Sequence, residues 1–151
     1  MEEIIKKLNY KGQQEIQVIR MPEELTPLFE QWGKEAKVLK DEAIKKDLDF
    51  LVAFLLDPAH IAQLAQELRQ VDQTRDPVLW FAYPKKSSKR YQTGLSRDHG
   101  WEPMGAIGLE PVRQVALDDD WSALRFRPVK KIKSLTRSSA LSKEGKERIR
   151  K

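Results

Sequence analysis

The stretch "DFLVAFLLDPAHIAQLAQELRQVDQTRDPVLWFAY", residues 49–83, decides the fold of this 151-residue chain. Its two apolar runs begin at Phe50 and Val78, have strand length and lack polar alternation, which is typical of strands covered on both faces. Between them, apolar residues recur at helical spacing over residues 61–71, after an Asp57 that suits a helix N-cap. A strand, a helix and a strand in this order predict a right-handed parallel crossover unit.

Upstream of this unit the pattern continues to alternate between helix and strand. Residues 4–8 carry a short amphipathic helix pattern that Gly12 should end, and "EIQVIR", residues 15–20, reads as a strand. Residues 22–33 have apolar side chains at helical spacing between a proline and a glycine. Residues 37–39 predict a short edge strand, with a polar helix as the alternative.

Downstream, a polar stretch with one short predicted helix leads to "EPVRQVALDDDWSALRFRPV", residues 110–129, which reads as two strands joined by an acidic turn. On the second strand Leu124 and Phe126 share a face opposite Arg125 and Arg127. The whole order predicts a Rossmann-like α/β fold. We expect a three-layer sandwich with a mostly parallel sheet that ends in an antiparallel hairpin, formed by one domain over residues 1–129.

Composition narrows the functional classes. The chain contains no cysteine, which excludes disulfide scaffolds, thiolate metal sites and cysteine catalysis and favours a reducing, cytoplasmic setting. The first residues are acidic where a signal peptide needs positive charge, and the longest apolar run has seven residues. We therefore expect a cytoplasmic protein with no membrane partner.

The net charge of +5 is concentrated at the C-terminus, because residues 130–151 hold nine basic and two acidic side chains. We expect this tail to be disordered or marginally helical. Such a tail can hold nucleic acid or another polyanion by counterion release, or can be only a solvated terminus. The candidate contacts are Lys130, Lys131, Lys133 and Arg137.

A small-molecule site is expected at the carboxyl ends of the parallel strands, where ligands of open α/β sheets bind. Basic and hydroxyl side chains follow two of the predicted strands, and further arginines could approach them after folding. This candidate site for a small anionic ligand consists of Arg20, Lys85, Lys86, Ser87, Arg97 and Arg125. The alternative interpretation of residues 85–88 is a flexible basic loop.

Searches for catalytic motifs fail. The sequence has no phosphate-binding G-x-x-x-x-G-K-[ST] run, no G-x-G-x-x-G turn after the first strand, no G-x-S-x-G elbow and no H-E-x-x-H. The acids Asp118, Asp119 and Asp120 could form a metal corner, but consecutive acids at a hairpin more often favour the turn itself. We predict no catalytic residue, no metal and no cofactor.

The segments "LWFAYPKKSSK" and "SRDHGWEPMGAIGLEPVRQVALDDDWSALRFRPV" carry a resemblance. With their "YPK", "GW" and "DDDWSALRFR" marks, they resemble a bacterial family of small proteins that has a domain-of-unknown-function label, over most of residues 1–135. The layout also resembles the C-terminal half of Rossmann-like methyltransferases. The glycine-rich cofactor turn of that fold family is replaced here by "VIRMPEEL" after the first strand.

Three functional hypotheses follow. The main expectation is a non-enzymatic binding or regulatory domain whose basic tail contacts nucleic acid or another polyanion. The first alternative is a small-molecule enzyme, or a degenerate methyltransferase-like domain, that binds an anionic ligand or nucleotide. The second alternative is a protein-interaction module that uses an exposed edge strand or a surface formed by Trp101 and Trp121.

Overall fold

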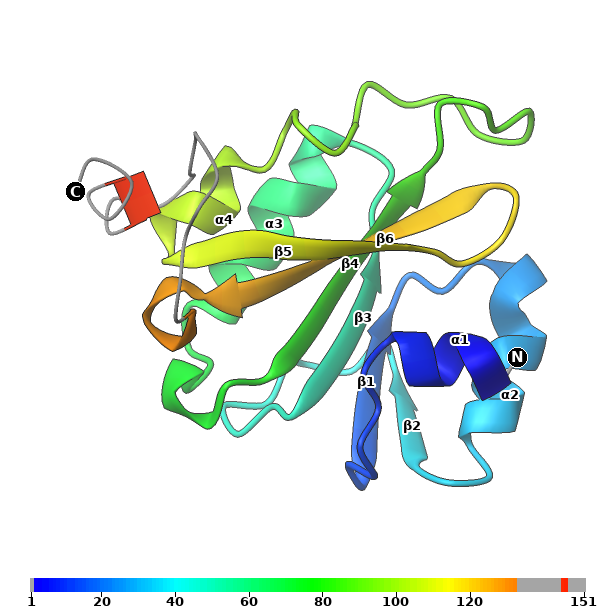
Figure 1. Ribbon diagram of the computed structural model, residues 1–151, viewed down its shortest axis with the longest axis horizontal. Helices are drawn as coiled ribbons and strands as arrows, with labels where there is room; N and C mark the ends of the chain where they lie inside the picture. The colour runs from blue at the N-terminus through cyan, green and yellow to red at the C-terminus, as the bar shows by residue number, and fades with distance from the viewer. Residues whose placement is uncertain (1, 133–144, 147–151) are drawn as a thin grey trace.

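The computed structural model describes residues 2–132 and 145–146, and it contains one six-stranded sheet in the order β2-β1-β3-β4-β6-β5 (Figure 1). Two of the residues predicted to contact nucleic acid, Lys133 and Arg137 of the tail, lie outside the described residues. The strands are β1 (Glu15–Ile19), β2 (Lys37–Lys40), β3 (Phe50–Phe54), β4 (Val78–Pro84), β5 (Leu109–Ala116) and β6 (Trp121–Pro128). Within residues 2–132 the α-helices are α1 (Glu2–Lys7), α2 (Thr26–Trp32), α3 (Pro58–Leu68) and α4 (Glu102–Ala106).

The sheet is parallel from β2 to β4 and antiparallel beyond it. Strands β3 and β4 run in the same direction, with Phe50 opposite Val78, and every residue of both strands is buried. Strand β6 then pairs antiparallel with β4, and β5 pairs antiparallel with β6. The predicted mostly parallel α/β sheet with a terminal hairpin is therefore confirmed.

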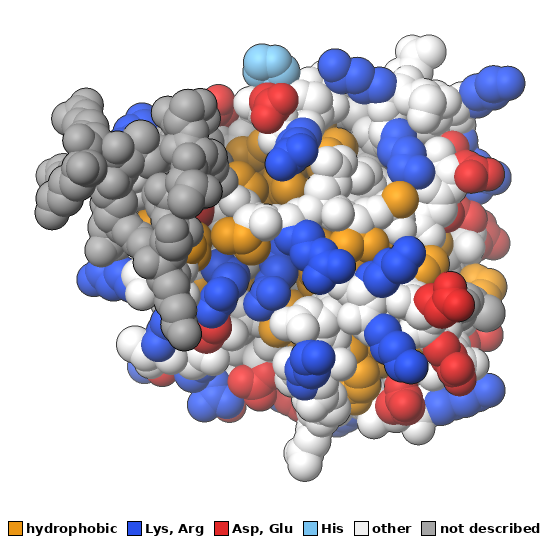
Figure 2. Space-filling view, in the orientation of Figure 1, with side chains coloured by type: hydrophobic (Ala, Val, Ile, Leu, Met, Phe, Trp, Pro, Cys, Tyr) orange, Lys and Arg blue, Asp and Glu red, His pale blue; other side chains and the backbone are white. Residues whose placement is uncertain are grey.

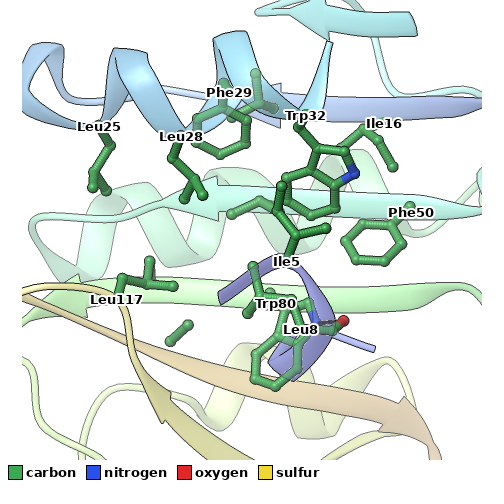
Figure 3. Close-up of a cluster of buried hydrophobic side chains, with 14 of the residues drawn as sticks. Ile5, Leu8, Ile16, Leu25, Leu28, Phe29, Trp32, Phe50, Trp80 and Leu117 are labelled. Carbon is green, nitrogen blue, oxygen red and sulfur yellow. Dashed lines mark hydrogen bonds between the residues drawn. The ribbon is translucent and has the colours of Figure 1, made fainter. Parts of the chain in front are cut away.

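Helices cover both faces of the sheet, so the domain has three layers (Figure 1). On the first face, α1 and α2 pack against β1, β3 and β4 through a cluster that includes Leu28, Trp32 and Phe50 (Figure 3). The indole Nε1 of Trp80 donates to the carbonyl oxygen of Leu8 at 2.7 Å, which ties the end of α1 to the centre of β4. A backbone carbonyl that α1 would otherwise leave unpaired is thereby satisfied.

On the second face, α3 and α4 bury the opposite set of side chains. Leu64 and Leu68 of α3 pack with Leu51, Leu79 and other apolar residues of the sheet. Helix α3 begins where the sequence predicts, because the Asp57 side chain accepts a hydrogen bond from the backbone N–H of His60 at 2.9 Å. Alternation along β3, β4 and β6 thus separates two apolar clusters, one on each side of the sheet.

Two helix boundaries differ from the sequence-based expectation. The first helix ends at Lys7 rather than near Gly12, because Asn9 already adopts a left-handed conformation with φ of 63°. The predicted helix over residues 22–33 is divided into a 3-10 turn, Glu23–Leu25, and α2. Pro27 is the second residue of α2, where a missing backbone N–H costs no intrahelical hydrogen bond.

The edge strand and the acidic turn are confirmed. Residues of β2 pair with β1 in parallel, Glu15 opposite Lys37, so the polar-helix alternative is wrong. At the turn, Asp118 Oδ1 accepts hydrogen bonds from the backbone N–H groups of Asp120 and Trp121 at 2.8 and 2.7 Å.

Within residues 2–132 and 145–146, no group of three or more acidic or histidine side chains is placed to hold a metal ion. In the same described ranges, no helix is long and apolar enough to cross a bilayer.

Candidate ligand-binding site

The carboxyl ends of β1 and β3 mark the point where the chain connections diverge. Strand β1 leads through α2 on the first face to β2, whereas β3 leads through α3 on the second face to β4. Adjacent parallel strands whose connections leave in opposite directions form a topological switch point, and ligands of such folds bind just beyond it. The geometry of the sheet therefore selects one edge for a binding site.

A hollow of about 490 Å³ lies at this edge, within the size range of small-molecule sites. Three segments supply its lining: the end of β1, the loop after β2, and one side of α3 together with the turn that follows it. The lining residues are Ile19, Arg20, Asp41, Glu42, Ala43, Ile44, Gln63, Glu67 and Gln70. We call this feature the carboxyl-edge hollow.

Two strained residues shape the rim of the carboxyl-edge hollow. Arg20 and Asp41 directly follow β1 and β2, and both adopt left-handed backbone conformations, with φ of 56° and 53°. The backbone N–H of Arg20 donates to Asp41 Oδ1 at 2.8 Å, and the N–H of Asp41 donates to the Val18 carbonyl at 2.8 Å. Left-handed conformations of non-glycine residues cost of order 1–3 kcal/mol each, so surrounding contacts must hold them.

A buried amide holds the loop after β2, whose residues line the carboxyl-edge hollow. Gln17 is 2% exposed; its Nε2 donates to the Ala43 carbonyl at 3.0 Å, and its Oε1 accepts from the Lys45 backbone N–H at 3.0 Å. Gln70, in the turn after α3, donates to the Ile44 carbonyl at 3.1 Å. The loop after β2 is thus bonded to β1 on one side and to the turn after α3 on the other, so its position does not depend on a ligand.

The charge of the lining is negative. Asp41, Glu42 and Glu67 contribute three carboxylates, and Arg20 contributes one guanidinium, which gives a formal charge of −2. Arg20 Nη2 donates to Gln63 Oε1 at 3.3 Å, so the guanidinium lies beside α3. The set is rich in hydrogen-bond acceptors and contains one cation, which suits a ligand with hydroxyl donors, positive charge and a single carboxylate.

A second polar cluster lies on the other side of the carboxyl edge, centred on Glu24. Its carboxylate accepts hydrogen bonds from the Tyr91 hydroxyl at 2.7 Å and from Trp121 Nε1 at 3.1 Å, and it forms a 3.3 Å ion pair with Arg90. Trp121 also meets Phe54, the last residue of β3, with ring centroids 5.2 Å apart. Side chains therefore fill the first-face side of the edge.

Hydrogen bonding decides the ionisation of Glu24. Burial alone acts to raise the pKa of this carboxyl, but the hydrogen bonds from Tyr91 and Trp121, together with Arg90, hold the pKa below its usual range. Glu24 is therefore a stably ionised anchor that joins the turn after β1 to the loop after β4.

The structure separates the residues of the predicted anion site. Of the six, only Arg20 lines the carboxyl-edge hollow. The backbone N–H of Lys85 donates to the Asp120 carbonyl at 2.8 Å beside the hairpin turn, and Lys86 and Ser87 are exposed in the following loop. Arg97 is exposed in the loop before α4.

Arg125 lies apart from all of them. It occupies the middle of β6, opposite Trp80 of β4, and not the carboxyl edge. The six residues therefore do not meet in one pocket, and anion binding by Lys85, Lys86, Ser87 or Arg97 stays a prediction. Lys130 and Lys131 are exposed in a 3-10 turn, Val129–Lys131, that follows β6.

Sequence reasoning missed most of the hollow. Asp41 and Glu42 follow the edge strand directly, and treating that strand on equal terms with the other parallel strands would have found them. Gln63 and Glu67 occupy the polar side of α3, and Gln70 follows the helix two residues after its end. These three residues carry no local signal of a site.

The proposed aromatic interaction surface is also absent. Trp101 and Trp121 are each only 2% exposed, and Trp101 packs against Phe81 with ring centroids 6.3 Å apart. The two indoles are core residues, so the alternative of a Trp101/Trp121 docking surface is wrong.

Comparison with known proteins identifies the fold. No protein-family model matches the chain, and no curated protein matches it. Among solved structures, a SAM-dependent methyltransferase from Aquifex aeolicus superposes with a TM-score of 0.52 at 16% identity, covering 83% of this chain and 87% of that one. A putative type 11 methyltransferase from Sulfolobus solfataricus gives a TM-score of 0.54 at 6% identity, covering 84% and 90%.

These neighbours correct the main functional expectation. A non-enzymatic binding or regulatory domain with a basic tail was expected, but the chain has the fold of methyltransferases, which the first alternative anticipated. The sequence departs from that fold family at the turn after β1. At such low identity the likeness establishes architecture, and function has to be argued from the site.

Proposed function

We propose that this protein is a methyltransferase-like domain that binds S-adenosylmethionine, or a closely related cationic adenosine metabolite, in the carboxyl-edge hollow. The observation that carries the proposal is the position of an acceptor-rich, negatively charged hollow at the topological switch point. The fold shared with two methyltransferases supports it as an analogy.

The chemical groups of this ligand match the lining. Ribose hydroxyls donate hydrogen bonds, and Asp41, Glu42 and Glu67 offer carboxylate acceptors. The sulfonium and ammonium centres of the ligand are positive, so they are attracted by a lining with a formal charge of −2. The single carboxylate of the ligand has one candidate partner, the Arg20 guanidinium, whose planar fork suits bidentate pairing. When bound, this cofactor supplies an electrophilic methyl group.

The turn after β1 has a backbone conformation that favours glycine, although no glycine is present there. Arg20 adopts the positive φ that favours glycine, so the tight turn is present although its residue carries a long side chain. In the free protein this side chain contacts Gln63. Ligand binding therefore exchanges the bond from Arg20 to Gln63 for a bond to the ligand carboxylate, which is a specific feature of this chain.

Thermal unfolding with added ligands tests the proposal. S-adenosylmethionine and S-adenosylhomocysteine should raise the unfolding temperature, and at about 100 times the dissociation constant the stabilisation should reach about 2.7 kcal/mol. ATP, which is strongly anionic, should give a smaller shift, because the lining repels it.

Matched variants locate the effect. Asp41→Asn and Glu67→Gln should weaken the stabilisation, whereas Glu30→Gln, an exposed charge-matched control on α2, should leave it unchanged. Lys85→Ala should also have no effect, since Lys85 does not line the hollow. Absence of any shift with either adenosine ligand, or equal shifts in all variants, contradicts the proposal.

A further inference from the structure

The antiparallel end of the sheet presents an open face that α1 and α2 do not cover. Val115 and Ala123 join the buried cluster of the first face, but the next residues on the same side of β5 and β6 are arginines. Figure 2 shows lysine and arginine side chains gathered across this face, over the β5–β6 hairpin. We call Arg113, Arg125 and Arg127 the arginine strip.

The sheet register places the three side chains of the arginine strip next to one another. Arg113 of β5 lies directly opposite Arg125 of β6, and Arg127 follows two residues further on the same side of β6. Two residues of extended strand span about 6.6 Å, and directly opposed residues are closer still. Three guanidinium groups therefore project from one small area of sheet.

Among the described residues, one arginine of the strip forms an ion pair. Arg127 Nη2 and Nε contact Asp76 Oδ2 and Oδ1 at 2.7 and 3.3 Å, which is a bidentate ion pair. Within the part of the chain that the structure describes, no carboxylate lies within ion-pair distance of Arg113 or Arg125. Among the described residues, Arg113 and Arg125 are therefore the two cations of the strip outside an ion pair.

Arg125 is held in an unfavourable environment. Its Nε is buried and lacks a hydrogen-bond partner within the described residues. Burial lowers the pKa of this guanidinium, and the positive charges of Arg127 and Arg113 lower it further, with Asp76 acting in the opposite direction. Like charges directly opposed on a sheet are destabilising, so the arrangement is costly for folding and favourable for an incoming anion.

We propose that the arginine strip binds the phosphodiester backbone of a nucleic acid. The arginine fork matches phosphate oxygens, and a row of cations on a sheet face meets several phosphates of a polymer at once. A small anion needs a concave site to be held, and the hollow of this protein lies elsewhere and is acidic.

Other charged partners fit less well. A membrane surface calls for exposed apolar or aromatic anchors, and among the described residues of β5 and β6 Val112 is the one large hydrophobic residue that is exposed. Lys130 and Lys131, exposed just after β6, extend the positive surface toward the tail. The strip belongs to the folded sheet, so its contribution is separable from that of the tail.

Fluorescence anisotropy of the full chain with a labelled 20-nucleotide single-stranded RNA, and with DNA of the same sequence, tests the proposal between 50 and 200 mM salt. We expect Arg113→Gln/Arg125→Gln to weaken binding about tenfold or more at low salt. The slope of log affinity against log salt should fall in magnitude by about 1.4, which corresponds to two phosphate contacts at about 0.7 each.

The control is Lys34→Gln/Lys37→Gln, which removes the same charge from exposed positions beside the opposite edge of the sheet. The control should bind within about twofold of the parent protein, since electrostatic contacts act locally at these salt concentrations. Equal weakening in both double variants, or none in the strip variant, overturns the proposal.

Two further measurements identify the class of partner and check that the strip variant is folded. Polyglutamate of matched length should compete poorly; competition equal to that of the oligonucleotide overturns the nucleic-acid assignment in favour of an acidic protein. The strip variant should unfold at the temperature of the parent protein or above, because it loses repelling charges. S-adenosylmethionine stabilisation should be the same in the strip variant, so the two proposals fail independently.

Discussion

The carboxyl-edge hollow on the parallel half of the sheet and the arginine strip on its antiparallel end gather charge in different ways. In the parallel half, loops from separate strands and a helix converge at one edge, and their polar residues line an open hollow. In the hairpin, alternation and register align side chains in a row on an open face. Parallel topology therefore builds a concave acidic site, and antiparallel topology builds an extended basic one.

The two sites also differ in how they are supported. In the hollow, the buried amide of Gln17 satisfies one carbonyl and one N–H of the loop after β2. In the strip, Arg125 has a buried nitrogen without a partner in the described part of the chain and faces Arg113. Substitution of Gln17 should therefore lower stability, whereas an apolar replacement of Arg125 should not.

The largest expected effect is at the hollow. Gln17→Leu removes both hydrogen bonds and leaves the Ala43 carbonyl and the Lys45 N–H without their partner, which should cost about 2–4 kcal/mol. Denaturant unfolding measures this loss, and S-adenosylmethionine stabilisation should disappear with it. Gln66→Leu on the exposed side of α3 is the control, and a similar loss there contradicts the role assigned to Gln17.

The next effect concerns the anchor across the edge from the hollow. Glu24→Gln should cost about 1–2 kcal/mol at pH 7, because the carboxylate accepts two hydrogen bonds and pairs with Arg90. The folded-state pKa of Glu24 is lowered, so its stabilisation is present above the unfolded-state pKa and is lost as pH falls through the folded-state pKa. Unfolding curves of parent and variant should converge in acid; a constant difference down to pH 2 is the contrary result.

A smaller effect of opposite sign is expected in the strip. Arg125→Met should leave stability unchanged or raise it by about 0.5–1 kcal/mol, because an apolar side chain removes the repulsion from Arg113 and the unpaired buried nitrogen. Arg127→Met should instead lower stability, since it leaves Asp76 without its bidentate partner. Urea unfolding of both variants gives the sign of each change in the free energy of unfolding. Destabilisation by Arg125→Met contradicts the unfavourable environment assigned to Arg125.

The smallest change in stability is expected at Arg20, where the ligand response is informative. Arg20→Gly relieves a positive φ and loses one exposed 3.3 Å hydrogen bond to Gln63, so the free energy of unfolding should change by less than about 1 kcal/mol. Calorimetry should show weaker binding of S-adenosylmethionine but unchanged binding of adenosine, which has no carboxylate. Equal losses for both ligands contradict the pairing of Arg20 with the carboxylate.

Much of the fold could be predicted from local patterns. The buried strands from Phe50 and Val78, the start of α3 after Asp57 and the two faces of β6 all follow from spacing and capping, which depend on neighbours in sequence. The break between the 3-10 turn and α2 escaped prediction, because the same spacing fits one helix or two short ones.

The sequence by itself determined the order of the elements, the covered strands and the side of each strand that is apolar, because these properties repeat along the chain with a fixed period. Only the tertiary structure decided that Gln17 would hold the loop after β2, that Arg20 would meet Gln63, and that Arg113 would face Arg125. These contacts join residues 12 to 43 positions apart, and no local period specifies which distant side chains the sheet order and register bring together.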